Sequence, residues 1–311
     1  MALIETIYDE VIFEYQPFIK VYKSGKIERF VGTDIVPATL NSPNYVSSKD
    51  VTISPEKHVS ARLYLPTNIK KEEKLPLLIY FHGGAFCLCS PFCALYHNYL
   101  TSLVSKANVV AVSVDYRLAP ENPLPAAYED SWDALLWVVS HSSCHGPESW
   151  LNDHVDFGRV FVGGDSAGAN ISHNIAQRAG IEKLEGLELN GACVIHPDFV
   201  GEEGSLNEVW KFICPGSFGE EDLRINPAID PRLGSLGCTK MFVCVAEKDE
   251  FRDAGWIYYE AIKKSGWKGE VLFHETFGEA HVFHIFNPAS KNAEPFMEKM
   301  VSFINGTIAS T

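Results

Sequence analysis

The chain has no hydrophobic run long enough to cross a membrane. No window of its 311 residues approaches the roughly 18 consecutive apolar residues of a membrane span. The N-terminal stretch MALIETIYDEVIFEY is acidic, whereas a secretory signal begins with positive charge. We therefore expect a cytoplasmic or nuclear protein.

Basic residues are also scarce. Lys and Arg total 26 against 40 Asp and Glu, for a net charge of −14. This balance repels phosphate backbones and anionic lipid surfaces. We expect neither nucleic acid nor a membrane as a partner, and the polypeptide could act as a monomer or a homodimer.

The eight cysteines do not follow any CxxC spacing. Several lie in apolar runs such as GACVIHP and MFVCVAEKD, where Cys behaves as a small buried hydrophobe. A disulfide framework is not expected in a large chain without an export signal, and the spacing does not indicate zinc. We predict reduced, structural cysteines and no zinc site.

Short apolar runs alternate with segments of helical periodicity, which predicts an α/β fold. Strands are expected over 74–84, 108–120, 159–168, 189–197, 240–249 and 269–281, and helices over 128–141, 167–180, 250–266 and 293–306. Strands that are apolar throughout need cover on both faces, so the sheet should be mainly parallel with helices on either side.

Two regions depart from this alternation. FIKVYKSGKIERF, at 18–30, predicts a hairpin around KSGK. The stretch 198–236 is rich in Gly, Pro and acidic residues. We expect a single domain over 1–311, with 1–40 and about 198–230 as cap segments over the sheet.

The first candidate for chemistry is Gly164-Asp165-Ser166-Ala167-Gly168, between a predicted strand and a predicted helix. In G-x-S-x-G the glycines allow a sharp turn that lifts the serine hydroxyl above the sheet. The N-terminal amides of the following helix point to the same place, where an oxyanion would develop. The alternative is a tight turn with a helix-capping serine.

A second motif, FHGGAF at 81–86, follows an apolar strand. An oxyanion hole needs backbone N–H groups that a substrate oxygen can approach, and glycines permit this approach. We expect donors from Gly83, Gly84 and Ala167, the alternative being an ordinary strained turn.

A serine nucleophile needs a base, and the base needs a carboxylate. Asp249 follows one predicted strand and His281 follows the next, which gives the chain order Ser, Asp, His. The nearby candidates Glu247, Asp253, His274 and His284 are disfavoured by position: Glu247 lies nearer the strand, Asp253 in the next helix, and His274 within a strand. His284 fits a satisfied core histidine, and His281 with His284 lacks further ligands for a metal.

HGGAF, DYRLAPENPLPAAYED (115–130), GDSAGAN, AEKDEFRD and SGWKGEVLFHETFGEAHVFHIF together resemble the plant carboxylesterases of the hormone-sensitive-lipase-like group, from about Phe18 to the C-terminus. The resemblance implies an α/β-hydrolase fold with an N-terminal cap, no cofactor, and hydrolysis of small plant metabolites. It places the nucleophile, acid, base and oxyanion glycines on Ser166, Asp249, His281, Gly83 and Gly84. It also implies that 115–130 mainly braces loops behind the site.

The chain departs from the family pattern at three positions. Ala85 replaces the third glycine of HGGG, which we expect to be tolerated because the first two glycines carry the donors. Ala169 replaces a common glycine after the nucleophile. Asp198, in HPDF, stands where relatives often carry an aromatic residue, which places an acid near the substrate.

The resulting hypothesis is a serine carboxylesterase acting on a small ester substrate through an acyl-enzyme. The alternatives are a dehydratase or cyclase on the same scaffold, or a small-molecule receptor, although the gibberellin receptors that resemble it lack the histidine. The predicted substrate-binding residues are Phe13, Phe18, Ala85, Asp198, Phe199, Trp210 and Phe212.

Overall fold

A computed structural model describes residues 9–40, 45–70, 73–200 and 208–307. Its centre is an eight-stranded sheet in the order β11-β10-β9-β8-β6-β7-β5-β4. These strands are β4 (Val46–Ser54), β5 (Val59–Pro66), β6 (Leu75–Phe81), β7 (Val110–Asp115), β8 (Val155–Asp165), β9 (Leu189–Ile195), β10 (Cys238–Ala246) and β11 (Glu270–Thr276). Neighbours from β11 to β7 are parallel, and only β5 and β4 join antiparallel. The prediction of a mainly parallel sheet is confirmed.

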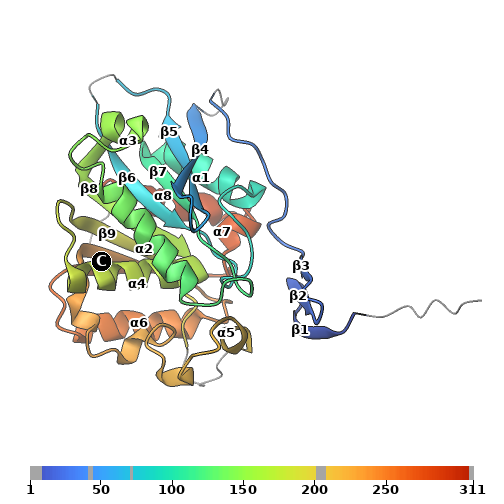
Figure 1. The fold of residues 1–311 in the computed structure, drawn as a ribbon. Coiled ribbons are helices and arrows are strands. Elements are labelled where there is room, and N and C mark those ends of the chain that lie inside the picture. The colour runs from blue at the N-terminus through green and yellow to red at the C-terminus, as the bar shows by residue number, and fades with distance from the viewer. Residues whose placement is uncertain (1–8, 41–44, 71–72, 201–207, 308–311) are drawn as a thin grey trace, which may run out of the picture.

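Helices cover both faces of this sheet (Figure 1). One layer holds α2 (Ala126–Val139), α4 (Ala167–Glu182) and α6 (Arg252–Lys264), and α2 packs against α4. The other holds α1 (Ala94–Ala107) and α8 (Ala293–Ile304), which pack together. The shorter helices are α3 (Ser149–His154), α5 (Glu208–Ile213), α7 (Phe283–Phe286) and the 3-10 turns η1 (Gly219–Glu221), η2 (Pro227–Ile229) and η3 (Leu233–Ser235). Two-sided cover explains why every residue of β6 is buried.

Each predicted strand and helix of the core is present, but α1, β4 and β5 were not predicted. The N-cap residue of α1, Cys93, makes no capping hydrogen bond with its side chain, and the first turn has no acidic residue. The helix therefore lacks the usual start signal. The edge strand β4 mixes serine, lysine and aspartate with apolar residues, which weakens its alternation.

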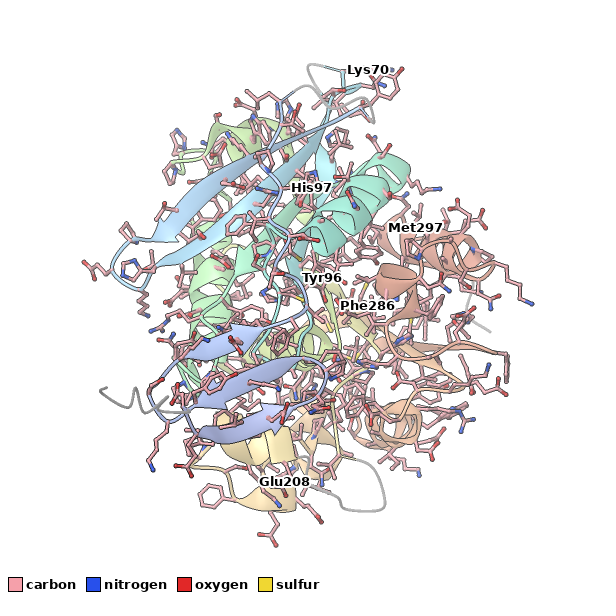
Figure 2. All side chains as sticks on the ribbon, turned by 90° about the vertical axis from the view of Figure 1, so that its right-hand side faces the viewer. Lys70, Tyr96, His97, Glu208, Phe286 and Met297 are labelled. Carbon is pink, nitrogen blue, oxygen red and sulfur yellow. The ribbon has the colours of Figure 1, made fainter. Side chains whose placement is uncertain are left out.

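A separate three-stranded sheet consists of β1 (Val11–Tyr15), β2 (Ile19–Tyr22) and β3 (Ile27–Arg29). The hairpin predicted within 18–30 is confirmed as the antiparallel pair β2 and β3. Figure 2 shows this sheet beside α5, which begins at Glu208, and near Tyr96 and Phe286. Phe13 of β1 stacks on Phe212 of α5, with ring centroids 3.8 Å apart. Residues 1–8 and 201–207 of the predicted cap segments lie outside the described residues.

The carboxyl ends of the parallel strands meet at one edge of the sheet, where the connecting loops of such folds carry the functional groups. Strands β6, β8, β9, β10 and β11 end there at Phe81, Asp165, Ile195, Ala246 and Thr276. The motifs that carry Gly83, Ser166, Asp198, Asp249 and His281 each follow one of these strand ends, and the segment 115–130 follows the end of β7, so the fold brings them together.

Candidate active site

Ser166 occupies the sharp turn between β8 and α4. Its backbone has φ 54° and ψ −120°, a left-handed conformation that costs a non-glycine residue about 1–3 kcal/mol. The flanking glycines are required by close packing: a Cβ on Gly168 would lie 2.0 Å from the carbonyl oxygen of Phe81, and one on Gly164 2.4 Å from it. The turn therefore presents the Ser166 hydroxyl at the N-terminus of α4. Its side chain does not cap the helix, which argues against the capping alternative.

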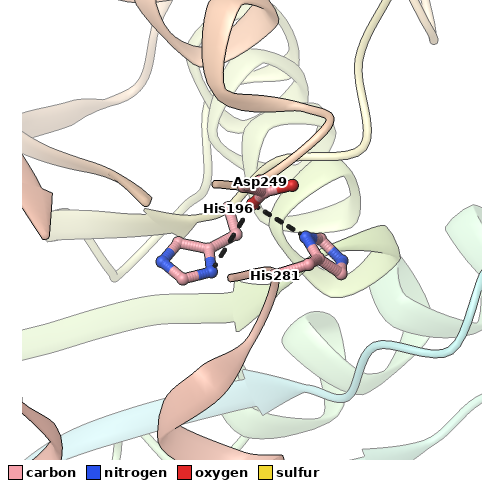
Figure 3. Close-up of side chains that lie close together, drawn as sticks. All are labelled: His196, Asp249 and His281. Atoms are coloured by element: carbon pink, nitrogen blue, oxygen red, sulfur yellow. Dashed lines mark hydrogen bonds and ion pairs between the residues drawn. The ribbon is translucent and has the colours of Figure 1, made fainter. Parts of the chain in front are cut away.

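Ser166, His281 and Asp249 form a continuous hydrogen-bonded chain. Ser166 Oγ lies 2.9 Å from His281 Nε2, and His281 Nδ1 lies 2.8 Å from Asp249 Oδ2. The backbone N–H of Phe251 donates to the other carboxylate oxygen of Asp249 at 2.9 Å. Figure 3 shows the Asp249 carboxylate beside the imidazole of His281.

The alternative acids and bases lie elsewhere. Glu247 accepts a hydrogen bond from the Gly278 N–H, and Asp253 lies in α6, paired with Arg252. His274 lies within β11, as predicted. His284 is buried, but neither of its ring nitrogens has a hydrogen-bond partner in the described part of the chain, so its description as a satisfied histidine was wrong. Burial lowers the pKa of His284 to about 3, which keeps the ring neutral.

The carboxylate of Asp249 and the imidazole of His281 stabilise each other's charge. Burial raises the pKa of Asp249, but the hydrogen bond and charge of His281 outweigh burial and hold this pKa below its ordinary value. Burial lowers the pKa of His281, but the hydrogen bond and charge of Asp249 outweigh it and raise this pKa. Because Nδ1–H donates to Asp249, the neutral ring presents the lone pair of Nε2 to Ser166.

A second histidine, His196, lies next to Asp249 and to the segment that carries His281. The sequence did not predict it as part of the site. Its Nδ1 accepts the backbone N–H of Val282 at 2.8 Å and lies 3.7 Å from Asp249 Oδ2 (Figure 3). Burial lowers the pKa of His196 well below its ordinary value, so the ring is neutral. His196, Asp249 and His281 are close enough together to hold a metal ion, but their facing atoms are engaged in the hydrogen bonds just described.

The oxyanion donors differ from those predicted. The Gly83 N–H donates to the hydroxyl of Tyr96 at 2.7 Å, and Tyr96 donates to Asp165 Oδ2 at 2.8 Å. The prediction that Gly83 is a donor was therefore wrong, because its N–H is already engaged. The N–H groups of Gly84, Ala85 and Ala167 have no hydrogen-bond partner within the described ranges.

Gly84 and Ala85 line the cavity that contains Ser166. Ala85 was predicted to contact the substrate, with the donors on the two preceding glycines. The structure instead leaves the Ala85 N–H free while Gly83 is engaged in anchoring the loop. Any amino acid except proline supplies this N–H, which explains why alanine can stand at the third position of HGGG.

The cavity around Ser166 has a volume of about 400 Å³. Of the predicted substrate-binding residues, Phe18, Ala85 and Asp198 line it. The other four do not. Phe199 is buried against His173 and Tyr258, Trp210 is buried against Phe86, and Phe13 and Phe212 stack on each other. Sequence reasoning missed several lining residues, among them Val31, Leu88, Glu250, Phe251 and Phe286.

The charged residues of 115–130 brace loops, as the resemblance implied. Arg117 forms a bidentate pair with the buried Asp130. Glu121 accepts two hydrogen bonds from Arg29 at the end of β3, and Arg29 also donates to the carbonyl oxygen of Cys87. This contact joins the small sheet to the loop that follows β6.

Comparisons with known proteins agree with this fold. A family model described as "alpha/beta hydrolase fold" matches residues 78–285. The chain is 48% identical to a probable carboxylesterase 4, mitochondrial, from Arabidopsis thaliana, over 96% of this chain and 84% of that protein. It is 46% identical to a 2-hydroxyisoflavanone dehydratase from Glycyrrhiza echinata, over 95% and 96%. The solved structure of EstE1, a carboxylesterase from a metagenomic library, superposes with a TM-score of 0.70 at 27% identity, covering 88% of this chain and 92% of that one.

The fold and the site define an α/β hydrolase. Within that class, the chain belongs to the family of plant carboxylesterases, and its enzyme class is that of the carboxylic ester hydrolases. Among the described residues, no helix is both long and apolar enough to cross a membrane.

Proposed function

We propose that this protein is a serine carboxylesterase that hydrolyses small esters through Ser166, His281 and Asp249. The observation that carries the proposal is the hydrogen-bonded chain from Ser166 Oγ through the His281 ring to Asp249. This chain lies at the wall of a cavity large enough for a small ester.

Each group has a role that follows from its geometry. His281 Nε2 takes the hydroxyl proton as Ser166 Oγ attacks the ester carbonyl carbon, and Asp249 stabilises the imidazolium. The N–H groups of Gly84, Ala85 and Ala167 donate to the oxyanion. The imidazolium then protonates the departing alcohol, and water releases the acid from the acyl-serine by the same route.

The contacts of segments 9–40 and 208–230 support the proposal that these segments form a cap over this site. Tyr15, Phe18 and Val31 reach the cavity from the small sheet, and the stacked pair Phe13 and Phe212 holds this sheet against α5. We propose that these segments, within a single domain, restrict the size and shape of the ester.

A dehydratase is the second candidate, because the chain is also 46% and 41% identical to proteins named 2-hydroxyisoflavanone dehydratase, from Glycyrrhiza echinata and Glycine max. The same histidine could remove a proton beside a carbonyl while the free amides stabilise the enolate. Such a reaction forms no acyl-serine, so it would survive Ser166→Ala. A receptor would have no need of the complete hydrogen-bonded chain.

The test is hydrolysis of p-nitrophenyl acetate together with labelling by a fluorophosphonate probe. We expect both to be lost in Ser166→Ala and His281→Ala, and retained in Ser143→Ala, an exposed serine at the opposite end of the domain. A wild-type protein that hydrolyses no ester but dehydrates a 2-hydroxyisoflavanone would favour the second candidate. The predicted cytoplasmic location, oligomeric state and lack of nucleic-acid binding remain predictions, and one relative is named mitochondrial.

A further inference from the structure

Asp198 is a buried residue whose carboxylate has no partner among the residues that the structure describes. Its side chain lines the cavity around Ser166, and the residue is only 7% exposed. The Asp198 N–H donates to the carbonyl oxygen of Ser166 at 3.3 Å, which holds the backbone of Asp198 beside that of the proposed nucleophile. Neither carboxylate oxygen accepts a hydrogen bond or forms an ion pair within the described ranges. A buried charge without a partner costs several kcal/mol, so this arrangement needs an explanation.

The other buried acids show how unusual this is. Each of the others in the described part of the chain has at least one side-chain partner. The pairs are Asp130 with Arg117, Glu148 with Lys49, Asp165 with Tyr80 and Tyr96, Asp222 with Arg224, Asp230 with Arg232, and Asp249 with His281. Asp198 departs from this rule, and it lines a cavity in which a ligand could supply the partner.

The rest of the cavity has the composition of a cation site. Glu250 also lines it, and none of the lysines and arginines in the described part of the chain does. The basic side chain that lines it is His281, which is already held between Ser166 and Asp249. Aromatic rings of Tyr15, Phe18, Phe251 and Phe286 form much of the wall, and ring faces attract cations.

The charge state of Asp198 agrees with such a role. Burial raises the pKa of Asp198 to about 6, so the carboxylate is ionised at neutral pH. Tyr15, Asp198 and Glu250 all line the cavity, and burial together with the charges of Glu250 and Asp198 raises the pKa of Tyr15.

We propose that the substrate is an ester that carries a positively charged nitrogen, an ammonium group bound between Asp198 and the aromatic wall. The inference rests on the proposed esterase function and names its substrate class. The backbones of Asp198 and Ser166 are joined by a hydrogen bond. The nitrogen of the substrate should therefore be separated from the scissile ester group by only a few bonds. The carboxylate gains its missing partner only when this substrate binds.

The experiment compares esters that have the same shape but differ in charge. Acetylcholine and 3,3-dimethylbutyl acetate place the difference on the alcohol side. The 4-nitrophenyl esters of 4-(trimethylammonio)butanoic acid and 5,5-dimethylhexanoic acid place it on the acyl side. We expect kcat/KM of the cationic ester to exceed that of its neutral counterpart by about tenfold or more in at least one pair, equivalent to ~1.4 kcal/mol.

Asp198→Asn should reduce this ratio toward one. The ratio is the decisive quantity because Asp198 also faces His281, and any change in His281 affects both members of a pair equally. Asp153→Asn is the matched control: Asp153 is exposed in α3, at the far end of β8, and the substitution removes the same charge. We expect it to leave both the activity and the ratio unchanged.

Binding provides a second measurement that needs no turnover. Acetylcholine should bind to Ser166→Ala in a calorimeter, and about tenfold more weakly to the double variant Ser166→Ala/Asp198→Asn. Ester hydrolysis without a preference for either cation, or a ratio unchanged by Asp198→Asn, would overturn the inference and leave the esterase intact. Cation binding that depends on Asp198, without hydrolysis of any ester, would support the site and overturn the proposed function.

Discussion

Replacing Tyr96 by phenylalanine would test how the oxyanion loop is held. The Tyr96 hydroxyl accepts the Gly83 N–H at 2.7 Å and donates to Asp165 Oδ2 at 2.8 Å, and the residue is 2% exposed. The substitution removes one oxygen atom and leaves the ring in place. It therefore leaves an N–H and one side of a carboxylate without partners in the interior.

The magnitude follows from these two groups. An unpaired buried N–H costs about 1–3 kcal/mol, and a hydrogen bond to a charged group contributes about 1.5–3 kcal/mol. Tyr80 still donates to the other oxygen of Asp165, at 2.8 Å, which limits the loss. We expect the free energy of unfolding to fall by about 3 kcal/mol. Because Gly83 anchors the loop that carries Gly84 and Ala85, kcat/KM should also fall by about tenfold or more.

Tyr99→Phe is the matched control. Tyr99 lies one turn further along α1, is 5% exposed, and its hydroxyl makes no hydrogen bond of ordinary geometry with the described residues. Its loss should change the stability by less than ~0.5 kcal/mol. Urea denaturation measures both variants: with an m-value of about 3 kcal/mol per molar, the midpoint should fall by about 1 M for Tyr96→Phe alone. Equal midpoints for the two variants, or wild-type kcat/KM in Tyr96→Phe, would refute the anchoring role.

Other predictions concern the turn, the base and its support. Gly168→Ala should abolish fluorophosphonate labelling and lower the melting temperature, since its Cβ would lie 2.0 Å from the Phe81 carbonyl oxygen; unchanged labelling would contradict this geometry. Asp249 raises the pKa of His281 by more than burial lowers it. With p-nitrophenyl acetate as substrate, kcat/KM should therefore fall as the pH drops through a midpoint above about 6.5. A lower midpoint would count against His281 as the base. In His196→Phe the N–H of Val282, the residue after His281, loses its hydrogen-bond acceptor. This variant should lower kcat about tenfold, leave KM little changed and shift the midpoint of the pH profile. A change in stability alone would give His196 a merely structural role.

Much of the site could be predicted from the sequence because its parts are local. The spacing of Gly164, Ser166 and Gly168 reports a backbone shape, and that shape requires glycine wherever another strand passes close by. Asp249 and His281 could be assigned because each follows the end of an apolar run. Parallel strands place such positions at the same edge of the sheet, whatever the loops contain.

The errors concern groups whose partners are distant in the chain. Gly83 is excluded as a donor by the hydroxyl of Tyr96, thirteen residues further on. Phe199 and Trp210 have the composition of pocket residues, but their rings pack into the interior against residues from other segments. No local pattern records which of several aromatic rings faces a cavity and which faces the core.

The sequence by itself determined the alternation of strands and helices in the parallel core except α1, the turn at Ser166, and which acid and base follow it at strand ends. These depend on periodicity, glycine and the position of strand ends, which are properties of neighbouring residues. Only the tertiary structure decided which aromatic rings line the cavity, and which amides, together with the Asp198 carboxylate, lack a partner among the described residues. Hydrogen bonds and burial depend on packing between distant segments. The type of reaction could therefore be predicted from the sequence, whereas the residues that select the substrate could not.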